Sequence, residues 1–316
     1  MKKVAVIGAG PSGITAIKNF KDQGFEVIAF ERCSGVGGNW RYNDPSGHSS
    51  VFETTHIISS KYTSYYEDFP LPKNAADYPS HKELLEYFQA YTNHFDLDKN
   101  IKFNTEVVHC SQDNSHKWKV KWRQLNDTQV LEEEFDALVV CNGHHHEPRY
   151  PNYPGKFSGE YLHSHEYKKA APFADKKVLV IGGGNSACDV AVETARISKT
   201  TALSWRRGYY LIPKFMFGLT SDIFALKARW IPKFLRLPFM KFMLELIQGK
   251  NEDIGLPKVT NHILATHPTV NSDLYNAVRH GKVKPKCDIE RFDGKTVYFQ
   301  DGTHEKFDAV IACTGY

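Results

Sequence analysis

The sequence contains few cysteines, and their spacing excludes two kinds of site. The six cysteines stand far apart and none forms a CxxC pair, so neither a zinc site nor a dithiol redox centre is indicated. No run of about 18 uninterrupted apolar residues occurs either, so we expect no membrane-spanning helix. The first apolar run starts at Lys2 or Lys3, which leaves no room ahead of it for a signal peptide. We therefore expect reduced thiols and a cytoplasmic protein.

A strong excess of one charge is also missing. The net charge of +4 over 316 residues is too small to indicate nucleic-acid binding, and we expect no nucleic-acid partner. A hydrophobic content of 41% and a charged content of 24% are ordinary for a folded globular chain. The length is sufficient for two domains.

The order strand, helix, strand occurs twice along the chain. Residues 2–8 form a short apolar run that ends in glycine, Ile14, Ile17 and Phe20 have helical spacing, and residues 25–30 form a second run. The same order returns in residues 177–182, 187–198 and 201–204. The pattern indicates a duplication of function, if not of sequence.

Other segments complete the expected architecture. Residues 80–91 have the pattern of an amphipathic helix, and residues 101–108, 117–124 and 130–135 alternate like antiparallel strands of a crossover layer. Residues 135–143 and 307–315 resemble each other as buried parallel strands that end in a small residue and glycine, and each is expected to close a nucleotide domain. The chain stops at Tyr316, directly after the second of them, which favours a fragment of a longer protein.

The first glycine loop has the context of a dinucleotide-binding fingerprint. Gly8-Ala9-Gly10-Pro11-Ser12-Gly13 follows an expected strand and opens an expected helix. Gly8 permits the tight turn, Gly10 lets the backbone approach a pyrophosphate, and Gly13 lets the helix pack on the strand. Glu31 lies 23 residues after Gly8, where a carboxylate can accept hydrogen bonds from a ribose hydroxyl.

The residues after Glu31 favour FAD as the first cofactor. A second glycine pair and an aromatic residue follow in the stretch from Arg32 to Trp40, an arrangement that flavin enzymes use to wrap the long cofactor. Trp40 either contacts the cofactor or anchors the loop. The residues predicted to bind FAD are Gly8, Ala9, Gly10, Pro11, Ser12, Gly13, Glu31, Arg32, Gly38, Asn39, Trp40, Ser59, Asn142 and Gly143.

The second glycine loop, Gly182 to Ala187, favours NADPH. At the position equivalent to Glu31 stands Trp205, followed by Arg206 and Arg207. A guanidinium there would bind a 2′-phosphate as a fork and stack on adenine; the competing interpretation is a solvated charge pair. The residues predicted to bind NADP are Gly182, Gly184, Asn185, Ser186, Ala187, Cys188, Asp189, Arg206 and Arg207.

With these residues in view, the chain resembles the flavin-containing monooxygenase family over essentially its whole length. Phe157, Gly159, His163 and Tyr167 fit the family's identifying pattern FxGxxxHxxx(Y/F). Further motifs stand in the family's order: Asp68-Phe69-Pro70, Asn142-Gly143-His144, His267-Pro268-Thr269 and Thr314-Gly315-Tyr316. Related Baeyer–Villiger monooxygenases typically carry tryptophan where this chain has Tyr167, so the resemblance implies the branch that oxygenates nitrogen or sulfur.

The resemblance implies a fold, a set of cofactors and a reaction. The fold class is α/β, with two dinucleotide-binding Rossmann-like domains and a small antiparallel β crossover layer. Residues 1–150 and 283–316 would form the FAD-binding domain, and residues 151–282 the NADPH-binding domain, with a helical insert at about 209–265. NADPH would reduce FAD, oxygen would add to give a C4a-hydroperoxide, and an amine or sulfide would be oxygenated. Ser186 to Asp189 would lie along the NADPH pyrophosphate.

One position departs from the family. Counting back from Asp68 with Ser59, Ser60 and Lys61 in register, the family's active-site asparagine falls on Ile58, which has no hydrogen-bond donor. Either Ser59, Ser60 or His56 takes over this role, or the chain releases hydrogen peroxide as an NADPH oxidase. The residues are also compatible with a Baeyer–Villiger-type oxygenase or with a cofactor-binding sensor without catalysis, and a homodimer is left open.

Two further features have competing interpretations. His144, His145 and His146 with His163 and His165 invite a metal site, but no carboxylate or cysteine completes a ligand spacing. We expect no metal, with His144 at the turn facing FAD and His163 in an interdomain linker. Residues 209–247 are rich in aromatic and basic residues, as in helices that contact a membrane surface. We favour an insert that shapes the substrate entrance.

Overall fold

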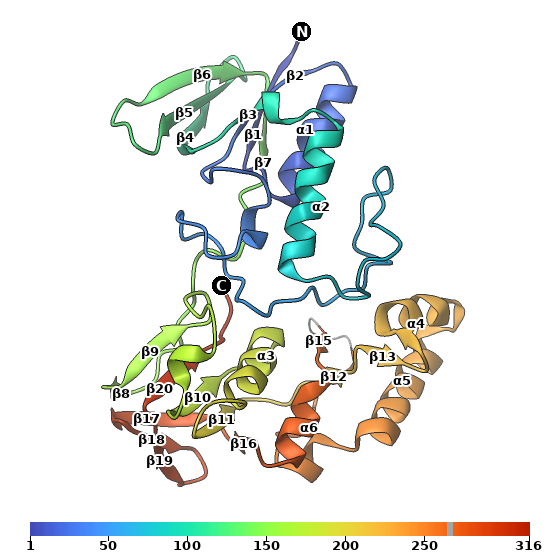
Figure 1. Ribbon diagram of the computed structural model, residues 1–316, viewed down its shortest axis with the longest axis vertical. Coiled ribbons are helices and arrows are strands. Elements are labelled where there is room, and N and C mark those ends of the chain that lie inside the picture. Colours follow the sequence, from blue (N-terminus) through green and yellow to red (C-terminus); the bar gives the residue numbers. More distant parts are fainter. Residues whose placement is uncertain (264–267) are drawn as a thin grey trace. The chain divides into compact units, whose positions relative to one another are not determined.

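The computed structural model describes residues 1–263 and 268–316, which divide into two units (Figure 1). Unit 1 comprises Met1–Ile57 and Tyr65–Glu147, and unit 2 comprises Ile58–Ser64 and Pro148–Tyr316. The main boundary therefore falls three residues before the expected one at residue 150. The short segment Ile58–Ser64 belongs to unit 2, although the chain on either side of it belongs to unit 1.

A four-stranded parallel sheet forms the frame of unit 1. Its order is β3-β2-β1-β7, with bounds β1 Lys3–Ile7, β2 Glu26–Phe30, β3 Ile101–Lys102 and β7 Ala137–Val140. Helices α1 (Pro11–Asp22) and α2 (His81–His94) cover one face. Val4 and Val6 point to this face and pack with Ile14 and Leu84, because alternate residues of a strand point to opposite faces.

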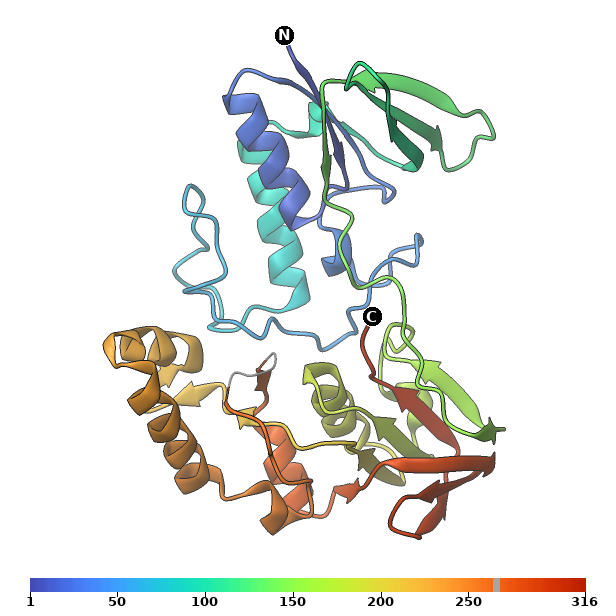
Figure 2. The same cartoon turned by 180° about the vertical axis from the view of Figure 1, so that it is seen from behind.

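An antiparallel layer covers the other face of that sheet, away from α1 and α2 (Figure 2). It consists of β4 (Thr105–Gln112), β5 (Trp118–Gln124) and β6 (Leu131–Phe135). Phe30 of the parallel sheet packs against Trp122 and Phe135. The expected strand 101–108 is wrong in its first part: Asn104 has a φ of +53°, and this turn leaves Ile101–Lys102 in the parallel sheet.

Unit 2 is built on a five-stranded parallel sheet. Its order is β16-β11-β10-β20-β9, with bounds β9 Glu160–His163, β10 Lys177–Ile181, β11 Thr200–Ser204, β16 Val283–Lys286 and β20 Ala309–Ala312. Helices α3 (Asn185–Thr194) and α6 (Asp273–Arg279) belong to it, and α3 contacts β10 and β11. A second antiparallel group joins β17 (Ile289–Gly294), β18 (Thr296–Phe299) and β19 (His304–Lys306), with β8 (Gly155–Phe157) at its edge.

The assignment of residues 283–316 to the first nucleotide domain is wrong. β16 pairs with β11, and β20 lies between β10 and β9, so the whole segment lies in unit 2. The reason is that an apolar strand can add to any parallel sheet, so its sequence alone does not indicate which strand it pairs with. His163 is likewise the last residue of β9 and not part of a linker.

The two units repeat the same local construction, which confirms the predicted fold class of two Rossmann-like domains with an antiparallel layer. The backbone N–H of Lys3, where β1 starts, donates to the Asp136 carboxylate at 2.7 Å. The backbone N–H of Lys177, where β10 starts, donates to the Asp308 carboxylate at 3.1 Å. Each aspartate directly precedes the strand that pairs with the first strand of its loop, β7 with β1 and β20 with β10. The duplication therefore includes side chains as well as topology.

A helical insert follows β11 in unit 2. Its elements are β12 (Leu211–Ile212), β13 (Phe215–Met216), β14 (Leu219–Thr220), α4 (Ser221–Lys227) and α5 (Lys233–Gln248), and β15 (Thr269–Val270) pairs with β12. Its small core includes Met216, Met240 and Leu244. The predicted end of the insert near 265 and His267 lie outside the described residues.

One side of α5 is apolar and exposed. Leu235, Phe239, Phe242 and Leu246 are exposed, and their spacing of three and four residues places them on one helix face. No helix in the described part of the chain is long and apolar enough to cross a bilayer. Membrane-surface contact and a substrate entrance therefore both stay predictions for this insert.

Short 3-10 turns complete the described structure, and all six cysteines are free thiols. These turns are η1 Gly38–Trp40, η2 Asp98–Asn100, η3 Ala171–Phe173, η4 Ala228–Trp230 and η5 Asn251–Ile254.

Helix α2 begins with a capping box that can be tested by mutation. The Ser80 hydroxyl accepts from the Glu83 backbone N–H at 3.3 Å, and the Glu83 carboxylate accepts from the Ser80 N–H at 2.8 Å. We expect Ser80→Ala to lower the free energy of unfolding of unit 1 by about 1 kcal/mol, because it leaves an N–H group of the first turn unpaired. Urea unfolding followed by circular dichroism measures this change. Gln89→Ala, at an exposed position of the same helix, is the control and should change stability by less than about 0.5 kcal/mol. Equal effects of the two substitutions would contradict the role of the cap.

Candidate dinucleotide sites

The first glycine loop is closed by backbone contacts that leave no room for side chains. Gly8 has a φ of +95°, and a Cβ there would lie 2.5 Å from the carbonyl oxygen of Cys141. A Cβ on Gly13 would overlap the carbonyl oxygen of Gly8. Helix α1 starts at Pro11, and its N-cap Gly10 supplies no side-chain cap. The first N–H groups of α1 are thus available to an anion such as a pyrophosphate.

The buried side chain of Glu31 contacts this loop through hydrogen bonds. Its side chain is only 5% exposed, and one carboxylate oxygen accepts from the Ala9 N–H at 2.6 Å. The other accepts from the Cys33 N–H at 2.7 Å. Glu31 therefore holds the loop and the end of β2 together, a role that its spacing alone did not reveal. The predicted contact with a ribose stays a prediction, since a carboxylate oxygen can accept a second hydrogen bond.

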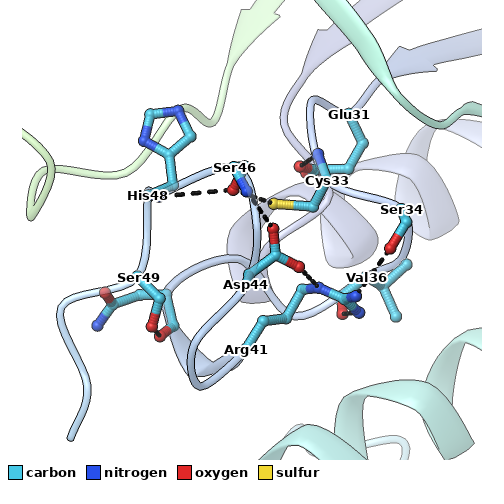
Figure 3. Close-up of polar contacts among 10 residues, drawn as sticks. Glu31, Cys33, Ser34, Val36, Arg41, Asp44, Ser46, His48 and Ser49 are labelled. Carbon is cyan, nitrogen blue, oxygen red and sulfur yellow. Dashed lines mark hydrogen bonds and ion pairs between the residues drawn. The ribbon is translucent and has the colours of Figure 1, made fainter. Parts of the chain in front are cut away.

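The loop after Glu31 is fixed by its own polar contacts (Figure 3). The Arg41 Nε donates to the Asp44 carboxylate at 2.7 Å, and another guanidinium nitrogen donates to the Ser34 hydroxyl at 3.1 Å. Burial opposes ionisation of Asp44, but hydrogen bonds from Arg41 and Ser46 outweigh it and lower its pKa to about 2. The Cys33 thiol lies 3.2 Å from the Ser46 hydroxyl. These contacts hold the chain on either side of Gly38–Trp40.

Gly38 and Gly10 face each other across the glycine loop. A Cβ on Gly38, whose φ is +53°, would lie 3.0 Å from the Gly10 Cα, so the two backbones pack directly. Asn39 holds the following chain by accepting from the Ser50 N–H at 2.8 Å, and Trp40 packs partly buried against the core of unit 1.

Two observations fit a bound dinucleotide at the first loop. The backbone approach at Gly10 and Gly38 leaves main-chain groups in place of side chains. The Arg32 Nε is buried without a hydrogen-bond partner among the described residues, and such a buried donor calls for an additional acceptor. Asn142 and Gly143 are exposed at the end of β7, and a Cβ on Gly143 would meet nothing within 4 Å.

The candidates near Ile58 are divided between the two units. Ile58, Ser59 and Ser60 lie in unit 2, whereas His56 lies in unit 1. The His56 ring Nδ1 lies 2.9 Å from the Tyr78 carbonyl oxygen. The Ser59 hydroxyl accepts from the Ser64 hydroxyl at 2.7 Å. Ser59, Ser60 and His56 therefore all stay candidates, and a role for any of them beside the flavin stays a prediction.

The second glycine loop repeats the first. Gly182 has a φ of +129°, and a Cβ there would overlap the carbonyl oxygen of Cys313. The contact corresponds to that of Gly8 with the carbonyl oxygen of Cys141 in unit 1. Helix α3 follows the N-cap Gly184, which supplies no side-chain cap and has nothing within 4 Å of an added Cβ. The loop therefore also presents helix N–H groups to an anion. Ser186 is exposed in the first turn, while Ala187 and Cys188 are fully buried.

Two side chains of α3 hold a neighbouring segment that the sequence patterns did not connect to this loop. The Asn185 side chain donates to the Pro268 carbonyl at 3.2 Å and accepts from the Val270 N–H at 2.7 Å. The Asp189 carboxylate accepts from Asn271 at 2.7 Å. Burial raises the pKa of Asp189 to about 6. Asn185 and Asp189 thus have structural roles here, and their predicted contacts with NADP stay predictions.

The two arginines after Trp205 have different surroundings. Trp205 is buried at the end of β11, and both arginines are exposed. The Arg207 Nε donates to the Tyr209 hydroxyl at 3.1 Å, and the Tyr209 ring lies directly against Gly183. Arg206 instead acts electrostatically on Tyr153, whose hydroxyl donates to Asp288 at 2.9 Å. Of the two, Arg207 alone is linked to the glycine loop by contacts among the described residues. It also lines a pocket with Tyr209 and Thr269.

The identifying pattern from Phe157 to Tyr167 is mainly a packing motif. Phe157, His163 and Tyr167 are buried, and a Cβ on Gly159 would lie 2.6 Å from the Asp308 carbonyl oxygen. Tyr167 stacks on Phe173 with ring centroids 5.7 Å apart. Among residues 1–263 and 268–316, no group of three or more His, Cys, Asp or Glu side chains is arranged to hold a metal ion.

Comparison with known proteins gives matches over the whole chain. A family model described as flavin-binding monooxygenase-like matches residues 1–316. Flavin-containing monooxygenase 5 of Rattus norvegicus is 36% identical, over 100% of this chain and 62% of its own length. A 4-hydroxybenzoate brominase (decarboxylating) of Marinomonas mediterranea is 33% identical, over 100% of this chain and 63% of its own length.

A solved structure agrees with these matches. The S-allyl-L-cysteine S-oxygenase from Allium sativum has a TM-score of 0.71 and 25% identity, over 100% of this chain and 62% of that one. The chain thus spans about 62% of the length of the first of these curated relatives.

Asp189→Asn tests the electrostatics around the second loop. The raised pKa of Asp189, about 6 against an ordinary 3.8, means that the folded chain keeps a proton that the unfolded chain releases. Stability from this group is fully present below about pH 4 and is lost as the pH rises through about 6. Asparagine removes the charge and keeps an acceptor for Asn271. We expect the thermal midpoint of the variant, relative to the unmodified chain, to rise between pH 4 and pH 7.

The control for this series is Asp98→Asn, at an exposed position of unit 1. Its difference from the unmodified chain should stay flat over the same pH range. A flat difference for Asp189→Asn as well would contradict the raised pKa.

Proposed function

The chain belongs to the flavin-binding monooxygenase-like family, and from that premise we propose an NADPH-dependent flavin monooxygenase that oxygenates a soft nitrogen or sulfur nucleophile. The observation that carries the proposal is the pair of matched glycine loops with different residues at the end of the second strand. Glu31 directly follows that strand in unit 1, and Trp205 with Arg206 and Arg207 follows it in unit 2.

FAD is assigned to the loop of unit 1. The backbone of Gly8–Gly13 and the facing Gly38 would hold its pyrophosphate, and the unpaired Arg32 Nε would donate to it. Asn142 and Gly143, exposed where β7 ends, would border the same cofactor, as ligands of such sheets bind at the carboxyl ends of the strands. When bound, FAD accepts a hydride and reacts with oxygen. The protein positions the flavin and excludes water around it.

NADPH is assigned to the loop of unit 2. The first turn of α3, including Ser186, would bind its pyrophosphate, and an arginine would bind its 2′-phosphate. We place this second contact on Arg207 because Tyr209 holds it beside Gly183. Glu31 at the equivalent place in unit 1 would repel a phosphate, which supports a different dinucleotide for each loop.

Two observations support nitrogen and sulfur compounds as the substrate class. Tyr167 stands where related Baeyer–Villiger monooxygenases typically carry tryptophan, and the relative from Allium sativum is named as an S-oxygenase. The brominase relative has a similar identity and is named for a different reaction. Amines and sulfides are therefore the first substrates to try.

A second candidate function is an NADPH oxidase that releases hydrogen peroxide. Ile58 favours it, because this side chain has no polar atom with which to stabilise oxygen bound at the flavin. The two candidates differ in where the electrons of NADPH go.

A balance of NADPH, product and peroxide tests the proposed function. We expect a panel of tertiary amines and thioethers to include at least one compound whose N-oxide or S-oxide accounts for most of the NADPH consumed. Chromatography of the products and a peroxide assay in the same sample give this ratio. If peroxide accounts for all NADPH with every compound, the oxidase is correct and monooxygenation is wrong.

Substitution of the two arginines separately tests the NADPH assignment. We expect Arg207→Ala to lower kcat/KM for NADPH about tenfold or more, with little change for NADH, because it removes a charge-assisted fork to the 2′-phosphate. Arg206→Ala is the matched control and should have the smaller effect. Steady-state rates with both nucleotides measure the ratio. A larger loss with Arg206→Ala would show that the geometry assigned the wrong arginine.

A further inference from the structure

The segment Ile58–Ser64 is fixed by a carboxylate that none of the sequence motifs includes. The Ser60 backbone N–H donates to the Asp222 Oδ2 at 2.7 Å, and the Thr63 hydroxyl donates to the same oxygen at 2.6 Å. Ser60 is fully buried, so its N–H group needs a partner inside the protein. Asp222 supplies it from a position 162 residues further along the chain.

The segment is folded around this contact. The Thr63 N–H donates to the Ser60 carbonyl at 3.1 Å, and the Tyr62 N–H donates to the Ser60 hydroxyl at 3.3 Å. The Ser64 hydroxyl donates to the Ser59 hydroxyl at 2.7 Å. These bonds form one tight turn, and Asp222 binds the turn at two points. Displacing Asp222 would therefore release Ser59 and Ser60 together.

Asp222 itself has a fixed place in the helical insert. It is the second residue of α4, and its Oδ1 accepts from the Ile223 N–H at 2.8 Å. The preceding Ser221 donates its N–H to the Lys214 carbonyl at 3.0 Å and its hydroxyl to the Pro213 carbonyl. The start of α4 is thus tied to the chain near β12 and β13, and Asp222 has little freedom to follow a moving partner.

The hydrogen bonds from Ser60 and Thr63 to Asp222 have a charged acceptor. Burial opposes ionisation of Asp222, but hydrogen bonds from Thr63 and Ser60 outweigh it and lower its pKa to about 2. Asp222 is therefore charged at neutral pH, and hydrogen bonds to a charged acceptor are stronger than neutral ones. These bonds join Ile58–Ser64 to unit 2, although its chain neighbours belong to unit 1.

We infer that Asp222 is a positioning residue for the oxygen reaction: it holds the turn that carries Ser59 and Ser60 and thereby limits the loss of NADPH electrons to hydrogen peroxide. The inference rests on the proposed function and on the resemblance that aligns Ile58, at the start of this turn, with the family's active-site asparagine. It assigns the helical insert a role beyond shaping a substrate entrance. The insert sets the geometry of the segment in which Ile58 has replaced the family's asparagine.

The experiment compares Asp222→Ala with Asp222→Asn, which keeps one acceptor oxygen, and with the control Glu245→Gln on α5. Amide hydrogen exchange of peptides covering 58–64 reports on the turn without turnover. Peroxide released per NADPH reports on the oxygen reaction, and anaerobic flavin reduction by NADPH reports on the step before it.

For Asp222→Ala we expect amide exchange in residues 58–64 to be at least about tenfold faster than in the unmodified chain, because a hydrogen bond to a charged acceptor is lost. We also expect a higher peroxide fraction and a rate of flavin reduction within about twofold of the unmodified chain. Asp222→Asn should give exchange rates and peroxide fractions between those of Asp222→Ala and the unmodified chain. Glu245→Gln should match the unmodified chain in both. If Asp222→Ala does not fold, Thr63→Val removes one donor and should show the same changes at smaller size.

Two results would overturn the inference: unchanged exchange in 58–64, or faster exchange with an unchanged peroxide fraction. If the unmodified chain converts NADPH entirely to peroxide, the proposed function fails and so does the control of peroxide release by Asp222. The exchange measurement still decides whether Asp222 anchors the turn, so the two failures are distinguishable.

Discussion

Both units depend on one steric constraint, the close approach of a glycine to the carbonyl that follows the neighbouring strand. Gly8 lies against the Cys141 carbonyl, and Gly182 lies against the Cys313 carbonyl. Neither place admits a Cβ, and each allows the chain to turn from strand into helix with its first N–H groups free. The contact joins each glycine loop to the strand beside it, β7 in unit 1 and β20 in unit 2. The anion-binding character of each loop therefore depends on how closely this neighbouring strand approaches.

The units differ in the residues that follow the second strand, and the proposed assignment of a different dinucleotide to each loop rests on this difference. Glu31 is turned inward and holds the glycine loop through Ala9 and Cys33. Its equivalent, Trp205, is buried and apolar, and the charge has moved to the exposed arginines that follow. A ribose with free hydroxyls suits the first environment and a 2′-phosphate suits the second. Beside this pair, the helical insert contributes Asp222, which fixes a segment of the chain that local sequence would leave in a loop.

The sequence was sufficient for features that depend on neighbours along the chain. The glycine loops, the helix capped by Ser80 and the antiparallel layer are local patterns, and they were predicted. Features that depend on distant partners were missed or misplaced. The strand Ala309–Ala312 was assigned to the wrong unit, because its apolar pattern suits either sheet. The contacts Asp222–Ser60 and Asp189–Asn271 join residues 162 and 82 positions apart. Aspartate near a helix start is common, so no local signal distinguished Asp222.

The central claim is that the two loops hold different dinucleotides and that electrons pass from one to the other. Anaerobic addition of NADPH to the FAD-loaded chain tests this claim most directly, with the flavin absorbance as the readout and NADH as the comparison. The account predicts that NADPH bleaches the oxidised flavin spectrum and that NADH does so much more slowly. A flavin spectrum that stays unchanged with NADPH would contradict the account and leave the chain as a binder of cofactors without catalysis.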